Sequence, residues 1–329
     1  MTTATILRLG ARGDGVAEAE GRLLHVPYAL PGEVVEIEPL SERIRTILMR
    51  SPDRVTPFCP HFGACGGCRM QHLAGEPYAA WKRGILEEVL VRAGIATAIA
   101  PLVDARGAGR RRVTLHVRFE KGRPLAGFMA AKSHDLIDLD LCPVLVPGLE
   151  RAADIARAVV MPLARLNKTA DVQVTTSLAG LDVDIRGPGK LDQPLRLALT
   201  EVAGQLDLAR LSLHGDIIVE RRPPALQMGK AMVVPPPGGF LQATEAGEAT
   251  LAGLVEAALG KAKKVADLFC GAGPFALRMA QARAVDAIDS DAPAIAALIR
   301  AARATPGLKP LKAEARDLFR RPLLAHELK

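Results

Sequence analysis

The chain has 329 residues, of which 49% are hydrophobic and 24% are charged, which excludes a disordered chain and allows two or three packed domains. Lys and Arg outnumber Asp and Glu by 43 to 36, a surplus that favours a polyanionic partner but equally fits a surface that only aids solubility. The sequence lacks a membrane helix and a signal peptide, so we expect a cytoplasmic protein without membrane contact. In the cytoplasm its five cysteines should be reduced. We also expect a monomer.

Residues 1–52 are predicted to form a small β-domain. Apolar and polar residues alternate in the segments VVEIE and RIRTILM, the period of half-buried strands, and Gly13, Gly15 and Pro31 mark turns between them. Five short strands in about fifty residues indicate a small closed barrel, such as an OB-like fold. A plain β-meander without a ligand is the alternative.

Residues 53–235 are predicted to form a central domain of mixed α and β structure. Pro and Gly are too frequent in residues 52–75 for a helix or a strand, and a helix is expected to follow over 78–93. We expect strands within residues 98–145 and in the segments DVQVTTS, LDVDIRG and DIIVERR, and helices over 147–166 and 192–206.

Residues 236–329 alternate between helical and strand patterns, which indicates a parallel, Rossmann-like sheet. The fold class is therefore α/β with several domains. The strand segments KVADLF, AVDAIDS and PLKAEA make only half of a doubly wound sheet, and parallel sheets are normally buried on both faces. We therefore expect the chain to be truncated, or to need a further segment for stability.

The segment VADLFCGAGPFAL predicts a ligand loop. An apolar strand is followed by Gly271 and Gly273 and then by a helix, and Asp289 ends the next strand, 18 residues after Gly271. Glycines let a ligand approach the backbone, and an acidic side chain at that position can accept hydrogen bonds from ribose hydroxyls. The pattern predicts a nucleotide-type ligand; the alternative is a tight turn without one.

Four cysteines have the pattern of metal ligands. Cys59, Cys65 and Cys68 form C-x5-C-x2-C in a Gly-rich loop, and Cys142 follows a predicted strand. Four thiolates can hold a [4Fe–4S] cluster or a zinc ion, and the spacing alone does not separate the two. Buried, inert cysteines are the alternative. The fifth cysteine, Cys270, lies in the glycine loop and is interpreted as a small packing residue.

A run of basic residues lies close to the cysteine pattern and fits either a track of phosphate contacts or a solvated strand face. The run consists of Arg106, Arg110, Arg111, Arg112, Arg118, Lys121 and Arg123.

The glycine loop, read as D-L-F-C-G-A-G-P-F, resembles the first motif of class I methyltransferases and, more narrowly, that of the RNA uracil-C5 methyltransferases. Their F-x-Q-x-N signature is similar to the segment Phe240–Thr244, in which Thr244 replaces the usual Asn. The resemblance implies that S-adenosylmethionine is the cofactor. It implies cofactor contacts at Gln242, Phe269, Gly271, Gly273, Asp289 and Asp317. An ordinary helix-start residue is the alternative for Gln242, and a helix N-cap is the alternative for Asp317.

The segment C-P-H-F-G-A-C-G-G-C-R-M-Q-H-L, with L-C-P-V-L further on, resembles the iron–sulfur domain of the ribosomal members of that family. The resemblance implies a [4Fe–4S] cluster on Cys59, Cys65, Cys68 and Cys142. The N-terminal pattern G-D-G-V-A resembles a TRAM domain, an RNA-binding module. Ribosomal RNA is the favoured partner, because the bacterial tRNA enzymes of the family generally lack the cluster.

The family's chemistry implies a cysteine that adds to C6 of uracil, so that C5 can take the methyl group, and a carboxylate base that removes the C5 proton. None of the five cysteines matches the nucleophile motif, so we expect no catalytic residue in this chain and no activity from it alone. The competing interpretations are a radical methylthiotransferase, whose C-x3-C-x2-C spacing is not met, and a non-catalytic RNA-binding zinc protein.

Overall fold

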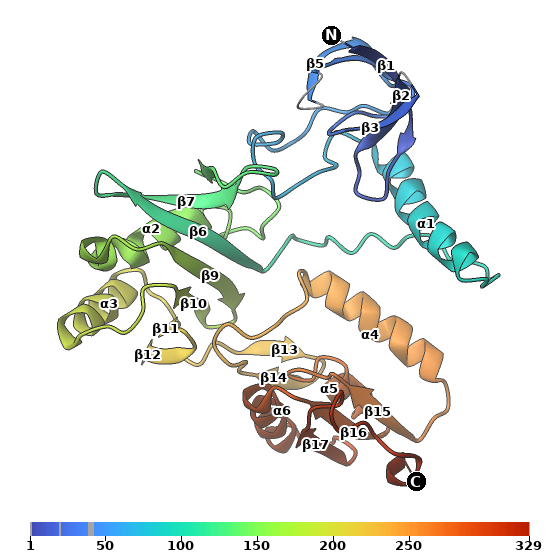
Figure 1. Ribbon diagram of the computed structural model, residues 1–329. Helices are drawn as coiled ribbons and strands as arrows, with labels where there is room; N and C mark the ends of the chain where they lie inside the picture. The colour runs from blue at the N-terminus through green and yellow to red at the C-terminus, as the bar shows by residue number, and fades with distance from the viewer. Residues whose placement is uncertain (1, 20, 39–42, 329) are drawn as a thin grey trace. The chain divides into compact units, whose positions relative to one another are not determined.

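The computed structural model describes residues 2–19, 21–38 and 43–328, and the chain divides into two compact units (Figure 1). The first unit comprises residues 1–104 and 128–137, and the second comprises residues 105–127 and 138–329. The three domains predicted from the sequence, at 1–52, 53–235 and 236–329, stay a prediction.

The first unit begins with a five-stranded antiparallel sheet in the order β3-β2-β1-β4-β5. The five strands predicted before residue 52 are thus present, and their alternate side chains build a core around Ile6, Ala17 and Val35. Closure into a barrel stays a prediction, since β3 and β5 end this order among the described residues. The strands are β1 (Thr2–Leu9), β2 (Gly15–Ala19), β3 (Arg22–Val26), β4 (Val34–Ile37) and β5 (Ile44–Met49).

A buried ion pair fixes the start of the cysteine loop to this sheet. Both Glu33 carboxylate oxygens accept from the Arg54 guanidinium, at 2.6 and 2.8 Å, and also from the backbone N–H groups of Leu30 and Ser51. Burial alone would raise the pKa of Glu33, but these hydrogen bonds outweigh it and hold that pKa below its ordinary value. The loop ends at helix α1 (Gly75–Arg92), close to the predicted 78–93.

Most of a larger sheet belongs to the second unit, including the strands β12, β11, β10, β9 and β6 in that order (Figure 1). The order continues with β7 and the short β8. Helices α2 (Ala152–Val160) and α3 (Gln193–Gln205) pack against it, and the 3-10 turn η1 (Met161–Leu166) lies between them. The strands are β6 (Arg112–Glu120), β7 (Arg123–Met129), β8 (Leu136–Asp138), β9 (Ala170–Ser177), β10 (Gly180–Arg186), β11 (Arg210–Leu213) and β12 (Asp216–Glu220).

The C-terminal part of the second unit is the predicted parallel sheet. Strands β15 (Lys264–Leu268), β16 (Ala284–Asp289) and β17 (Leu311–Ala315) pair in parallel in that order. Helix α6 (Ala292–Ala304) crosses between β16 and β17, as expected, and helix α4 (Glu245–Leu259) precedes β15. The helix predicted after the glycine loop is a single turn, α5 (Ala276–Met279). The last element is the 3-10 turn η2 (Ala325–Leu328).

The hairpin of β13 (Leu226–Met228) and β14 (Ala231–Val233) adds a layer that the sequence did not predict. Its buried side chains join those of α5, α6 and the parallel sheet in one apolar core, which includes Met228, Leu277 and Leu298. The hairpin therefore supports α6, the helix on which the glycine loop packs. Within the described ranges, no helix combines the length and the apolarity that crossing a membrane requires.

Candidate functional site

The candidate site lies where the parallel strands end. Strand β15 stops at Leu268, and the chain enters a loop in which Phe269, Gly271 and Gly273 have positive φ angles of 62°, 54° and 86°. The carboxyl ends of parallel strands meet at one edge of a sheet, which is where α/β proteins bind their ligands. Asp289 ends β16 at the same edge, so the structure brings the predicted loop and the predicted acid together.

The two loop glycines meet different requirements. A Cβ on Gly273 would lie 2.3 Å from Cδ1 of Leu298, so this glycine allows the loop to pack closely against α6. A Cβ on Gly271 would meet nothing within 4 Å. The space at Gly271 is therefore open to a ligand, whereas the space at Gly273 is filled by the protein.

Asp289 fixes the loop and keeps acceptor capacity. Its Oδ2 accepts from the Gly271 N–H at 2.8 Å, and its Oδ1 accepts from the Asp291 N–H at 2.9 Å. Asp291 in turn caps α6 by accepting from the N–H of Ala294. Because a carboxylate offers about four lone-pair positions, Asp289 can still accept hydrogen bonds from ligand hydroxyls.

Two exposed aromatic rings border this edge. Phe269 and Phe319 have centroids 5.5 Å apart and interplanar angle 43°, with exposed fractions of 57% and 89%. Asp317 shapes the turn that carries Phe319, since its Oδ1 accepts from the N–H groups of Phe319 and Arg320. These bonds follow the capping pattern of the N-cap alternative, but the segment that Asp317 caps is a single turn after β17. Exposed aromatic faces of this kind can cover the base of a ligand.

Asp267 is a site residue that the sequence analysis did not single out. Its side chain is buried beneath the loop, and its Oδ2 has no hydrogen-bond partner among the described residues. Burial, and to a smaller extent the charge of Asp289, raise the pKa of Asp267 to about 6, against a hydrogen bond from the Ala276 N–H. The signal in the sequence was an acid that ends an apolar strand before a glycine loop.

A buried charge network connects the Gln242 segment with the glycine loop. Glu248 of α4 is fully buried, and its carboxylate accepts from Arg111 at 2.5 Å and from Arg278 at 2.7 Å. Arg111 also donates to the Gln242 carbonyl at 3.2 Å, and Arg278 donates to the Pro274 carbonyl at 2.7 Å. This network links the Gln242 backbone to the glycine loop through Arg111, Glu248 and Arg278.

Cys270 is a core residue, as interpreted from the sequence. It is buried in the apolar core beside Leu277, and its pKa is raised by burial first and then by the charges of Asp267 and Asp289. A thiol held neutral in this way is a poor nucleophile.

The cysteine loop places three of the four predicted metal ligands in one segment. Cys59, Cys65 and Cys68 are half-buried thiols, and the Gly67 N–H points at the Cys65 sulfur at 3.4 Å. Burial raises the pKa of Cys65, and the nearby charge of Cys59 raises it further. The hydrogen bond from the Gly67 N–H lowers this pKa in part. Thiols in such surroundings need a cation to become thiolates. Across the described residues, however, no three His, Cys, Asp or Glu side chains converge as a metal site. Cys142 belongs to the second unit, so the four-ligand set stays a prediction.

Several residues of the basic run form ion pairs and hydrogen bonds within the protein. Arg111 belongs to the buried network, and Arg112 donates to the Gly239 carbonyl and lies over the Phe240 ring. Arg118 pairs with Glu120, and Arg123 pairs with Asp138. The interpretation of the whole run as a phosphate track is therefore wrong for Arg111, which is buried.

No protein-family model matches the chain. An uncharacterized RNA methyltransferase of Brucella suis is 46% identical over 326 residues, which cover 98% of this chain and 79% of the relative. The 23S rRNA (uracil(1939)-C(5))-methyltransferase of Yersinia enterocolitica is 31% identical over 314 residues, which cover 89% of this chain and 70% of that enzyme. Among solved structures, a Pyrococcus abyssi tRNA (uracil-54, C5)-methyltransferase in complex with S-adenosyl-L-homocysteine matches with a TM-score of 0.70 and 19% identity. That match covers 94% of this chain and 79% of the other, and at this identity it shows a common fold.

Proposed function

The chain belongs to the uracil-C5 family of RNA methyltransferases, and on this premise we propose that it transfers the methyl group of S-adenosylmethionine to C5 of a uracil in RNA. The observation that carries the proposal is the pairing of Gly271 with Asp289. An open position beside a backbone fixed by an acid, at the carboxyl edge of a parallel sheet, suits a ligand that carries a ribose.

Each residue at this edge has a role in holding such a donor. S-adenosylmethionine supplies an electrophilic methyl group on its sulfonium when it is bound. Asp289 would accept from the ribose hydroxyls, and Gly271 would let the backbone approach the ligand. The exposed faces of Phe269 and Phe319 would cover the adenine. The contacts at Gln242, Gly273 and Asp317 are carried over from the family resemblance, and for Gln242 the Arg111 hydrogen bond fixes the backbone in place.

The reaction itself requires a nucleophile that activates uracil. A thiolate adds to C6, and C5 takes the methyl group as the sulfonium S–CH3 bond breaks and S-adenosylhomocysteine leaves. A base then removes the C5 proton and the C6–S bond breaks. Cys270 is unsuited to this role, because burial raises its pKa and its thiol belongs to the core. The expectation that none of the five cysteines is the nucleophile, and that the 329 residues alone are inactive, stays a prediction.

Ribosomal RNA is the proposed substrate. The relative named for 23S rRNA shares 31% of its sequence with this chain, whereas the tRNA enzyme shares 19% and supports only the fold. A tRNA substrate is the alternative. Competition binding of the chain with ribosomal RNA and tRNA separates them without requiring methyl transfer: tighter binding of tRNA would overturn the ribosomal assignment.

A [4Fe–4S] cluster on Cys59, Cys65, Cys68 and Cys142 is part of the proposal, supported by the thiol chemistry of the cysteine loop. Anaerobic purification should yield a brown protein with broad visible absorbance and about four iron and four sulfide per chain. Stoichiometric zinc without sulfide would instead favour a tetrahedral zinc site.

Calorimetry with S-adenosylmethionine and S-adenosylhomocysteine tests the donor site. We expect both to bind, and Asp289→Asn to weaken binding at least tenfold, since the carboxylate loses its charge at the ribose. Asp291→Asn is the matched control, because it removes the same charge two residues away and Asn still caps α6. Equal affinities for the two variants, or no binding to the unsubstituted chain, would overturn the proposal.

A further inference from the structure

The opposite edge of the parallel sheet carries a second concentration of charge, and it is basic. A cation stands at the start of each parallel strand: Lys263 precedes β15, Arg283 precedes β16, and Lys309 lies two residues before β17. Lys261 lies in the same loop as Lys263. Since the amino ends of parallel strands meet at one edge, these four side chains gather at the edge away from the glycine loop.

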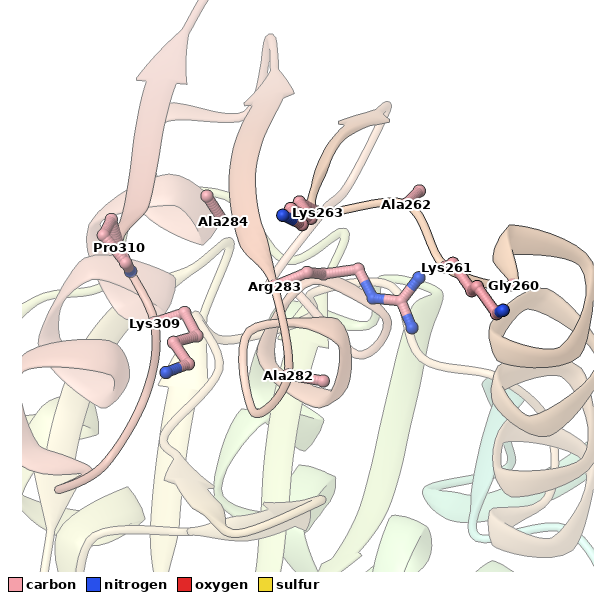
Figure 2. A pocket seen from close by; sticks show the side chains of 9 residues that line it. All are labelled: Gly260, Lys261, Ala262, Lys263, Ala282, Arg283, Ala284, Lys309 and Pro310. Atoms are coloured by element: carbon pink, nitrogen blue, oxygen red, sulfur yellow. The ribbon is translucent and has the colours of Figure 1, made fainter.

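These residues line an open hollow of about 490 Å³ (Figure 2). Figure 2 shows the Arg283 side chain extending toward Lys261, with Lys263 and Lys309 on the neighbouring strand connections. The floor is made of small residues, among them Ala282 and Ala284, so the hollow is shaped by the backbone and bordered by cations.

Arg283 distinguishes this hollow from a surface that is merely basic. Its side chain is only 8% exposed, and one nitrogen, Nη2, donates to Glu256 at 2.7 Å. Its Nε and Nη1 are buried and donate to no group among the described residues. A buried guanidinium normally uses its donors, because each unpaired one costs about 1–3 kcal/mol. Nη2 completes either two-nitrogen face of the guanidinium and is held by Glu256, and water does not reach Nε or Nη1, so Arg283 acts on the hollow through its charge.

The surrounding charges favour an anion. The Glu256 carboxylate, 34% exposed, and the last carbonyls of α4 oppose it, whereas four cations favour it. Lys264, the next residue, is paired with Asp286 at 3.1 Å and lies outside the hollow. We propose that this hollow binds a phosphate oxyanion between Lys261, Lys263 and Lys309, with the buried charge of Arg283 stabilising it. The phosphate comes either from an RNA backbone or from free phosphate.

Calorimetry with inorganic phosphate, at constant ionic strength and on the whole chain, tests the site. We expect the double variant Lys261→Gln/Lys309→Gln to weaken phosphate binding at least tenfold, while its exposed positions leave the fold intact. The control, Lys230→Gln/Lys312→Gln, removes the same charge from exposed lysines outside the hollow and should bind as the unsubstituted chain does. Arg283→Met should lose the binding altogether, with circular dichroism to verify its fold.

Fluorescence anisotropy with a labelled single-stranded RNA identifies the source of the phosphate. If RNA occupies the hollow, the slope of log affinity against log salt should fall by about 0.7 in the double lysine variant, since the hollow holds one phosphate and each lost phosphate contact removes about 0.7. If only inorganic phosphate responds to the substitutions, the ligand is a free phosphate. Unchanged binding of both probes in the lysine and Arg283 variants would overturn the inference. Donor calorimetry on the same variants should be unaffected, so this outcome is distinct from failure of the donor site.

Discussion

The two edges of one three-stranded sheet have opposite chemistry. The carboxyl edge is acidic, with Asp267, Asp289 and Asp317 at or just after the strand ends. There the backbone of the glycine loop adopts positive φ angles, which leave space open beside Gly271. At the amino edge, every strand is preceded by a cation and the ligand groups are side chains. The difference teaches that a parallel sheet can offer two separate sites: the acids and glycines of one suit the proposed ribose, and the Lys and Arg side chains of the other suit the proposed anion.

The carboxyl edge depends on a buried charge network, and the largest effect is expected there. Glu248→Ala leaves the guanidinium groups of Arg111 and Arg278 buried near the glycine loop without their carboxylate. We expect a loss of about 3–5 kcal/mol in the free energy of unfolding, the usual cost of breaking a buried pair from one side. Urea unfolding followed by circular dichroism measures it. Glu245→Ala, at the exposed start of the same helix, is the control, and equal stability of both variants would contradict the role of the network.

The two edges should also differ in their response to pH, because the pKa of Asp267 is about 6. A carboxyl whose pKa is higher in the folded than in the unfolded chain favours folding at low pH. The unsubstituted protein should therefore lose stability as pH rises from about 4 to about 6, by about 3 kcal/mol from this residue. Asp267→Asn should remove that loss. Stability curves against pH that are parallel for the two proteins would show that Asp267 ionises normally.

The loop glycines separate packing from ligand binding. Gly273→Ala should cost about 2–3 kcal/mol of stability, because its Cβ overlaps Leu298 and its φ is positive. Gly271→Ala should cost about 1 kcal/mol of stability, from its positive φ alone. It should nevertheless weaken binding of the methyl donor by more than this stability loss explains. Thermal unfolding and donor calorimetry on both variants make the comparison. Similar stability losses in the two variants would show that the space at Gly271 is not open.

The sequence predicted the carboxyl edge far better than the amino edge. Gly271, Gly273 and Asp289 form a local motif whose strand–loop–helix context can be recognised from spacing. Arg283 carries no such signal, because its burial and its unpaired donors arise only when β16 packs between its neighbours. A single basic residue before a strand is ordinarily interpreted as a solvated side chain.

Burial of charge also explains the strands that were missed. Strand β11 reads as RLSL and holds Arg210 in its buried interior, where a bidentate pair with Asp182 at 2.8 and 2.7 Å compensates the charge. An arginine argues against a buried strand unless its partner on β10 is known. Hairpin β13–β14 has strands of three residues each, too short for a period to be visible. By contrast, β9, β10 and β16 have clear patterns and were predicted.

The smallest effect is expected at the amino edge, where the Arg283–Glu256 pair is partly exposed. Glu256→Gln keeps an acceptor for Nη2, so we expect a stability loss below about 1 kcal/mol. The same substitution removes the negative charge nearest to the guanidinium and should strengthen phosphate binding about fivefold, since two unit charges about 4 Å apart in water interact by about 1 kcal/mol. Calorimetry with inorganic phosphate measures the change, with Glu245→Gln as the control of equal charge. Weaker phosphate binding in Glu256→Gln would mean that the carboxylate holds Arg283 in position, so that the placement of its charge at the hollow depends on this ion pair.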